Sequence, residues 1–350
     1  MTTYRCPTSA FVPTRHLTSF GIVDEEALLR HLFGKSKGKA VRSVGGNAAS
    51  PQVFNAMRFG FEYEILVSGF TKYTPPERMQ QLQDAVQPWT VTSDYSVRHD
   101  ADTKTYGRSP SSPDHAAAAA SGVPGAGYYG WEIISPVIEG YQEIRGVFKA
   151  FDAALKRSQF KFRNNTTTSN HVHISHPLFR DPVYLTKVVL AWLHYEDDML
   201  SFVHEARRDN KFCLSNARYL QNKHGTDAYA KFMASGELRH LGGLGANSKT
   251  VKAIVGTVQN DRRFALNLMN LLDGGIGTIE VRIKHGSNDM AANATWIEFL
   301  AVFFAAALQS PPIYEMDKKD LAAFCAGAGT SADVRLPRAR QGGGGMRRRP

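Results

Sequence analysis

The sequence has little cysteine and lacks any hydrophobic run long enough to cross a membrane. Its three cysteines, Cys6, Cys213 and Cys325, lie far apart and form no Cys-x-x-Cys pair. This spacing argues against a thiolate zinc site and against a disulfide framework, and it favours a reducing compartment. The N-terminal segment MTTYRCPTSAFVPTRH has no apolar stretch of the secretory type. The longest apolar run, residues 297–308, predicts a buried helix rather than a membrane span. We therefore expect a cytoplasmic protein without a membrane partner.

The composition is that of a folded, basic protein. Apolar residues make up 43% and aromatic residues 11% of the 350 residues, which suffices for a large core in one or two domains. The formal net charge is +10, part of which comes from the terminal segment MRRRP. A basic balance suits anionic partners such as nucleotides or polyphosphates. The basic residues form no recognisable nucleic-acid motif, so we do not expect a nucleic-acid partner.

The pattern along the chain predicts one catalytic domain with less regular ends. Residues 1–57 read as an N-terminal extension with one helix at 24–34, and residues 326–350 as a disordered basic tail. Within 58–325, residues 98–128 are polar and rich in Ala, Gly and Pro, which predicts a flexible insertion. Residues 262–273 fit either a strand or a helix. Mixed strands and helices indicate an α+β fold, with strands expected at 58–68, 89–97, 130–135, 171–175 and 278–286, and helices at 75–88, 139–159, 181–203, 215–222, 226–235 and 294–310.

Charged side chains alternate with apolar ones on several of the expected strands. Successive residues of a strand point to opposite faces, so Glu62 and Glu64 share one face. The same argument pairs His171 with His173 and groups Glu280, Arg282 and Lys284. Taken singly, each pair could instead be a solvated strand face, a satisfied histidine pair or a surface ion pair.

Together these segments favour a site for divalent metal and phosphate. Glu132 lies in the apolar run WEIISP, where a buried carboxylate is costly unless it is paired or bound to metal. Carboxylates are ligands that Mg²⁺ prefers, and Arg282 can bind an anion in bidentate fashion. Asp94 lies near a strand end, where a turn-capping role is an equal alternative. We expect an enzyme that acts on a phosphorylated substrate.

Seven segments follow one another as in a known family of ligases. They are FGFEYE, Trp89 to Ser96, WEIISP, HVHI, ARYLQN, RFALNL and TIEVRIKHGSND, and they cover roughly residues 58–310. In this order they resemble the amidoligase family, which is related to glutamine synthetase and glutamate–cysteine ligase. The resemblance implies a glutamine-synthetase-like catalytic domain, a curved antiparallel sheet with helices on its convex side. It also implies an ATP-dependent reaction, in which a carboxylate becomes an acyl phosphate and an amine then displaces the phosphate.

The resemblance assigns roles to particular residues. It makes Mg²⁺ or Mn²⁺ the metal, and it implies metal ligands at Glu62, Glu64, Glu132, His171 and Glu280. His173 and Arg282 would contact the phosphates of ATP, and Lys284 and Asn267 are further candidates on the cofactor side. Arg218 could bind the phosphate or the carboxylate substrate, and Asp94 is a further catalytic candidate.

Two other functions remain open, as does the substrate. A guanidino-kinase-like phosphotransferase would use a related sheet, and a basic protein could hold a nucleotide or nucleic acid without turnover. Carboxylate and amine substrates could be peptides, cell-wall fragments or polyamines. The sequence departs from relatives at TTSN (167–170), and the insertion 98–128 could form a lid or bind substrate.

Overall fold

The described part of the chain is the segment that carries the expected catalytic motifs. The computed structural model describes residues 51–70, 74–93, 97, 127–208, 210–242, 250–316 and 320–326. The expected helix at 24–34, Asp94, nearly all of the insertion at 98–128 and the tail after residue 326 lie outside the described residues.

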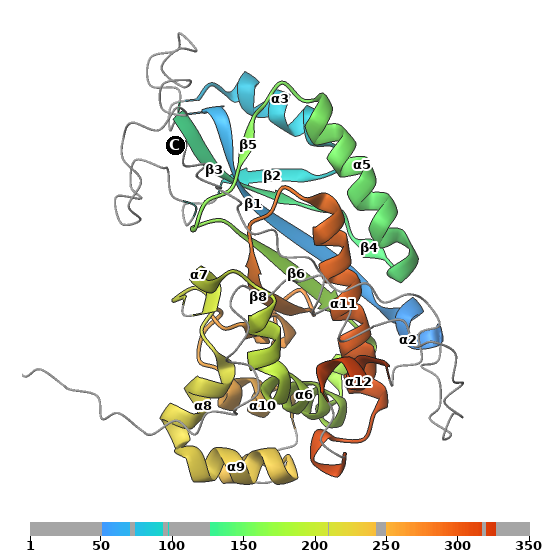
Figure 1. The fold of residues 1–350 in the computed structure, drawn as a ribbon, viewed down its shortest axis with the longest axis vertical. Coiled ribbons are helices and arrows are strands. Elements are labelled where there is room, and N and C mark those ends of the chain that lie inside the picture. Colours follow the sequence, from blue (N-terminus) through green and yellow to red (C-terminus); the bar gives the residue numbers. More distant parts are fainter. Residues whose placement is uncertain are drawn as a thin grey trace, which may run out of the picture. The chain divides into compact units, whose positions relative to one another are not determined.

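An open, curved antiparallel sheet forms the centre of the fold (Figure 1). Its strands follow the order β2-β3-β1-β6-β8-β7, and two short strands, β4 and β5, also pair with β1. The bounds are β1 Arg58–Phe70, β2 Thr90–Ser93, β3 Gly127–Ile134, β4 Ile138–Glu139, β5 Phe162–Arg163, β6 Ser169–Ser175, β7 Leu266–Asn267 and β8 Ile279–His285. The mixture of helices with an antiparallel sheet confirms the expected α+β class.

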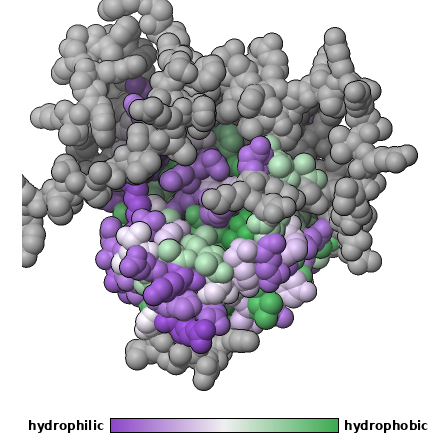
Figure 2. Space-filling model, turned by 60° about the horizontal axis from the view of Figure 1, so that its bottom comes forward, coloured by the Kyte–Doolittle hydropathy of each residue, from purple (hydrophilic) through white to green (hydrophobic). Residues whose placement is uncertain are grey.

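Helices α5 and α11 run beside the sheet, and α6, α8, α9 and α10 gather near the β8 end (Figure 1). The helix bounds are α2 Pro51–Ala56, α3 Pro76–Val86, α5 Ile144–Arg157, α6 Pro182–Ser201, α7 Glu205–Arg208, α8 Asn216–His224, α9 Thr226–Ser235, α10 Val251–Val258, α11 Met290–Gln309 and α12 Leu321–Ala326. Short 3₁₀ turns cover η2 Tyr141–Glu143, η3 Pro177–Arg180, η4 Leu238–Leu241, η5 Met269–Leu271 and η6 Ile313–Glu315. Figure 2 views the end that carries α9 and shows mostly hydrophilic residues there, with a smaller hydrophobic area between them.

Helix α11 is the core helix of the described fold. Asp289 caps its start by accepting a hydrogen bond from the backbone N–H of Ala292 at 3.0 Å, and the helix ends before Ser310. It is apolar all round, as a helix enclosed by other elements must be. Within the described residues it is the one helix long and apolar enough to cross a membrane, but 83% of that window is buried inside the fold. Such burial is typical of the core helix of a soluble protein.

The two faces of β1 have different chemistry, because its residues alternate. Phe61 packs edge-on against Phe148 of α5, with ring centroids 4.9 Å apart. Tyr63 packs against Phe151 of the same helix at 6.0 Å. Burying each such aromatic side chain contributes about 1.5–3 kcal/mol. The apolar face of β1 is therefore fixed against α5, and this packing directs Glu62 and Glu64 to the opposite face.

Two local features differ from the sequence-based expectations. Residues 262–273, which fitted either element, form the two-residue strand β7 and the turn η5. The expected common face of Glu280, Arg282 and Lys284 is wrong at Lys284. A register shift between β6 and β8 places Lys284 opposite Asn170, whose side-chain amide donates to Asn293 of α11. The Lys284 ammonium lies 5.7 Å from the ring centroid of Trp296 on α11, so it faces the helix layer.

Candidate active site

Glu62 stands at the centre of a cluster of acids and histidines, on the face of β1 opposite to the one that packs against α5. Its strand β1 lies between β3 and β6. The register pairs Glu62 with His171 of β6 and Glu64 with Glu132 of β3. The alternation predicted from the sequence is therefore real, and antiparallel pairing brings residues about 70 to 110 positions apart onto one face.

Both carboxylate oxygens of Glu62 contact histidines. His171 Nδ1 lies 3.0 Å from Glu62 Oε2, and His173 Nε2 lies 2.8 Å from Glu62 Oε1. His173 Nδ1 is 3.0 Å from the hydroxyl of Thr278, which precedes β8. With both ring nitrogens engaged, the His173 side chain has a fixed orientation.

These contacts shift the acidities of the central pair. Burial by itself raises the pKa of Glu62, but the hydrogen bonds and charges of His171 and His173 outweigh it and lower the pKa far below its usual range. Burial lowers the pKa of His173, yet the Glu62 contact and the charge of Glu280 outweigh it, and the pKa lies above its usual value. The carboxylate oxygens and imidazole nitrogens that share these protons and charges are also good metal ligands.

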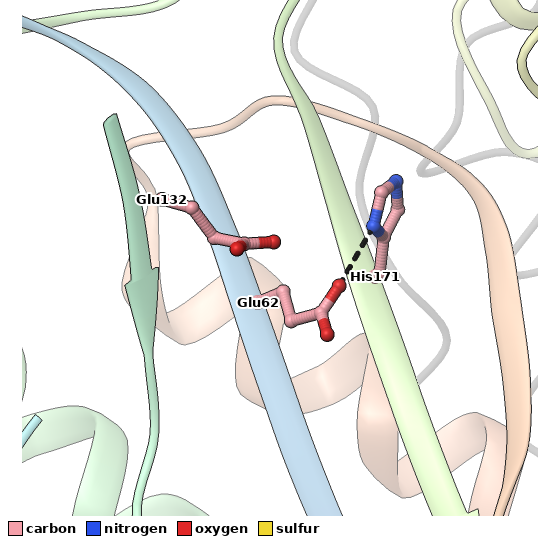
Figure 3. Close-up of side chains that lie close together, drawn as sticks. All are labelled: Glu62, Glu132 and His171. Carbon is pink, nitrogen blue, oxygen red and sulfur yellow. Dashed lines mark hydrogen bonds and ion pairs between the residues drawn. The ribbon is translucent and has the colours of Figure 1, made fainter. Parts of the chain in front are cut away.

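Two groups of ligand atoms can each hold a metal ion, and Glu62 belongs to both. Glu62, Glu132 and His171 form the first group, and Glu62, His173 and Glu280 form the second. Within each group one ligand atom from each residue lies within 4.8 Å of the others. Figure 3 shows Glu132 and His171 on either side of Glu62, on the strands that flank β1. The carboxylate oxygens suit Mg²⁺ and Mn²⁺, and the imidazole nitrogens are ligands for transition metals.

Glu64 extends the cluster on the side of the first group. Its carboxylate accepts a hydrogen bond from the hydroxyl of Ser169, and its Oε1 lies 3.5 Å from His171 Nε2. Ser169 Oγ also lies 2.9 Å from that same His171 nitrogen. Ser169 was missed from the sequence although it precedes His171 by two residues and so shares its face.

Glu280 closes the cluster on β8, and each of its oxygens is held. Oε1 accepts a hydrogen bond from Arg282 Nη1 and lies 3.5 Å from His171 Nδ1. Oε2 accepts a hydrogen bond from Asn267 Nδ2 at 2.7 Å. Arg282 Nε donates weakly to the carbonyl of Phe212 at 3.3 Å. The structure therefore brings Glu280, Arg282 and Asn267 together, as the sequence predicted for the first two.

The contacts described above do not include Arg218 or Lys284. Arg218 lies on α8 with an exposed side chain, and none of the hydrogen bonds above involves it. Lys284 faces the helix layer, as described above. Asp94 lies outside the described residues. The proposed roles of Arg218 and Asp94 stay predictions.

A buried polar network that the sequence did not reveal supports the β8 side of the cluster. Glu196 of α6 accepts hydrogen bonds from the side chains of Trp192 and Ser215 and from two backbone N–H groups at the start of α8. Asn216 pairs through its side chain with the N–H and C=O groups of Leu266 on β7. Gln259 donates to Asn267 at 2.9 Å. These contacts join segments that are distant in the sequence, so no periodic pattern predicts them.

A pocket of about 450 Å³ adjoins the cluster at the end of β1 and β6. Arg58 and Ser175 are register partners two steps beyond the Gly60–His173 pair, so they continue the face of the cluster. Arg58, Ser175, Arg180, Ile276 and Gly277 are among its lining residues. Ile276 is 71% exposed, and Thr278, two residues later, bonds His173. The pocket thus offers two guanidinium groups and an apolar wall beside the second metal-ligand group.

A family model described as "Putative amidoligase enzyme" matches residues 39–304, which is more than half of the chain and includes every residue of the cluster. No curated protein matches the sequence.

Proposed function

We infer that this chain, which belongs to the amidoligase family, is an ATP-dependent carboxylate–amine ligase that forms an amide or isopeptide bond. In the proposed reaction a carboxylate oxygen of the substrate attacks the γ-phosphorus of ATP, and ADP leaves. The amine then attacks the carbonyl carbon of the acyl phosphate, loses a proton and expels phosphate. The phosphate carries away one oxygen of the original carboxylate, and this gives the reaction a distinctive isotopic signature.

The observation that carries the proposal is the sharing of Glu62 between two metal-ligand groups. Phosphoryl transfer depends on charge neutralisation and alignment more than on a special nucleophile. Glu132 and His171 would hold one Mg²⁺ or Mn²⁺ ion with Glu62, and His173 and Glu280 would hold a second with it. Bound there, the ions would neutralise the phosphate oxygens and align ATP with the carboxylate.

The chain's own residues have separate tasks in this proposal. Arg282 hydrogen-bonds Glu280 and would donate to the phosphoryl group as it moves from ADP to the carboxylate. Glu64 lies on the other side of His171, where its charge supports the first group. The sheet gives all of these side chains a rigid platform, because β1 is paired on both sides and packed against α5.

The pocket beside His173 would receive the nucleoside of ATP. Its volume of about 450 Å³ lies within the roughly 300–1,000 Å³ typical of small-molecule sites. Arg58 and Arg180 can donate to phosphate oxygens, and the exposed Ile276 offers an apolar contact for a base. Thr278, which follows the lining residue Gly277, bonds His173 of the cluster. An ATP molecule placed in this way would present its phosphates to the second ligand group.

Isotope transfer tests the ligase reaction directly. The protein is incubated with ATP, Mg²⁺, a panel of amines that includes polyamines, and ¹⁸O-labelled carboxylates that include glutamyl peptides. We expect ADP, an amide and inorganic phosphate that contains one ¹⁸O atom, as detected by mass spectrometry. A stable N-phosphate without condensation would instead establish a phosphotransferase.

Matched variants connect that activity to the cluster. We expect Glu62→Gln and Arg282→Gln to lower kcat by at least about 100-fold, because the first removes the charge of the shared metal ligand and the second removes a cation that would meet the phosphates. The controls Glu237→Gln and Arg263→Gln change the same residue types in exposed ion pairs outside the cluster, and they should keep full activity. Full activity of Glu62→Gln with a folded protein would overturn the assignment of the site.

A further inference from the structure

We propose that Gln259 is a positioning residue, which helps to hold the amide of Asn267 and thereby fixes Glu280 Oε2, so that Oε1 faces the other metal ligands. This inference rests on the proposed function, because it concerns the second metal-ligand group. Gln259 lies just after α10 and is 1% exposed, and Asn267 on β7 is equally buried. Gln259 hydrogen-bonds Asn267, and Asn267 hydrogen-bonds Glu280 of the cluster.

The hydrogen bonds around Asn267 admit one amide orientation. Its Oδ1 accepts from Gln259 Nε2 at 2.9 Å and from the backbone N–H of Met269 at 3.0 Å. The backbone N–H of Met269 can only donate, so the atom that faces it must be the oxygen. Asn267 Nδ2 must then face Glu280 Oε2, to which it donates at 2.7 Å.

Gln259 is oriented by the same kind of argument. Its Oε1 accepts from the backbone N–H of Leu268 at 2.8 Å. Its Nε2 donates to the carbonyl of Asp261 at 2.8 Å as well as to Asn267. A backbone N–H on one side and a backbone carbonyl on the other therefore fix the Gln259 amide, and its Nε2 reinforces the Asn267 orientation that the Met269 N–H requires.

The consequence concerns how Glu280 can coordinate. Asn267 donates to Oε2, and Arg282 donates to Oε1. Of the two oxygens, Oε1 is the one turned toward the ligand atoms of the cluster, because it lies 3.5 Å from His171 Nδ1 and 4.0 Å from His173 Nε2. Glu280 would thus bind metal through Oε1. Partners of this kind fix the orientation of a ligating carboxylate, and their loss typically costs about 10–100-fold in metal affinity.

The test uses the variant Gln259→Glu, which keeps the size of the side chain and removes its Nε2 donor. Asn267 then loses a donor to Oδ1, and its amide is drawn toward the new carboxylate and away from Glu280. Mn²⁺ affinity is measured by calorimetry on the full chain without ATP, so the readout does not depend on turnover. We expect one Mn²⁺ site to weaken by about 10–100-fold.

Two further variants separate positioning from general damage. Gln83→Glu is the matched control, since Gln83 on α3 also donates to a backbone carbonyl, that of Trp89 at 2.7 Å, and accepts from the N–H of Val91. It should leave Mn²⁺ affinity unchanged while lowering the melting temperature to a similar extent. Asn267→Leu should weaken the same Mn²⁺ site, and the double variant Gln259→Glu/Asn267→Leu should be no weaker than the worse single variant, because both act on one carboxylate.

The outcomes distinguish the two proposals. Wild-type Mn²⁺ affinity in folded Gln259→Glu, or additive losses in the double variant, would overturn the positioning role and leave the ligase proposal standing. If the wild-type chain binds no Mn²⁺ at all, the metal site itself is refuted and the positioning role falls with it.

Discussion

Replacing Glu196 with glutamine should destabilise the protein far more than its conservative chemistry suggests. Each oxygen of this buried carboxylate accepts two hydrogen bonds. Oε1 accepts from Trp192 Nε1 at 3.2 Å and from the N–H of Asn216 at 2.9 Å. Oε2 accepts from Ser215 Oγ at 2.6 Å and from the N–H of Ala217 at 2.9 Å. Burial raises the pKa of Glu196, and these four donors oppose that shift.

The magnitude follows from the donors that an amide leaves unpaired. The better orientation puts the new NH₂ at the Oε2 position, where Ser215 can turn its hydroxyl to accept but Ala217 N–H meets another donor. An unpaired buried N–H costs about 1–3 kcal/mol, and weaker neutral hydrogen bonds on the other oxygen add roughly 1 kcal/mol. We therefore expect the free energy of unfolding of Glu196→Gln to fall by about 2–4 kcal/mol.

Urea denaturation followed by tryptophan fluorescence measures this loss. The control Asp197→Asn makes the same kind of change at the next, exposed position of α6 and should lie within about 0.5 kcal/mol of the wild type. A Glu196→Gln protein as stable as the wild type would mean that the carboxyl group is protonated in the folded state. That result would refute the reasoning from four donors.

Two other perturbations give results of defined sign. The His285 pKa is lowered to about 3, first by burial and then by neighbouring cations, so the unfolded chain takes up its proton from pH 6.5 downward while the folded chain does not. The contribution of His285 to the free energy of unfolding is therefore fully present above pH 6.5, and it is lost as the pH falls toward 3. Comparison of urea-melt free energies between the wild type and His285→Gln should show a difference that grows by about 1 kcal/mol per pH unit between pH 6 and 4, and parallel curves would contradict it. A Cβ at Gly277 would lie 3.1 Å from Arg180 Nη2, so Gly277→Ala should displace Arg180 and weaken ATP binding in calorimetry by about 3–10-fold. Gly274→Ala, at a similar positive φ but with no atom within 4 Å of its Cβ, should bind ATP as the wild type does, and equal weakening in both would assign the effect to backbone strain.

The part of the site that the sequence predicted is the part governed by strand alternation. Glu62, Glu64, His171 and His173 repeat at every second position, and the period of a strand is enough to place them on one face. Whether these side chains meet across strands depends on the strand register. The order of the motifs suggested that register through the family resemblance, and the apolar packing of β1 against α5 fixes it. Glu132 joined them because a lone carboxylate in an apolar strand needs a partner.

The part that the sequence did not predict depends on irregular backbone and on contacts between distant segments. Lys284 leaves the expected face because β8 shifts register against β6 between Arg282 and Lys284, and such a shift has no signature in the alternation. Strand β7 is two residues long, too short for any periodic pattern. Gln259 and Glu196 form hydrogen bonds with residues 8 to 21 positions away in the sequence. Composition does not indicate which residues these partners are.

The pairing of Asn216 with Leu266 also protects the end of the sheet. An edge strand with open N–H and C=O groups is a template for another chain and a starting point for aggregation. Here the side-chain amide of Asn216 accepts from Leu266 N–H at 2.9 Å and donates to its carbonyl at 3.1 Å, as a neighbouring strand would. The backbone of Phe264 lies beside Leu214 in a parallel bridge just before it. A side chain thus finishes the sheet at Leu266, and no second polypeptide can extend the sheet at that residue without first displacing it.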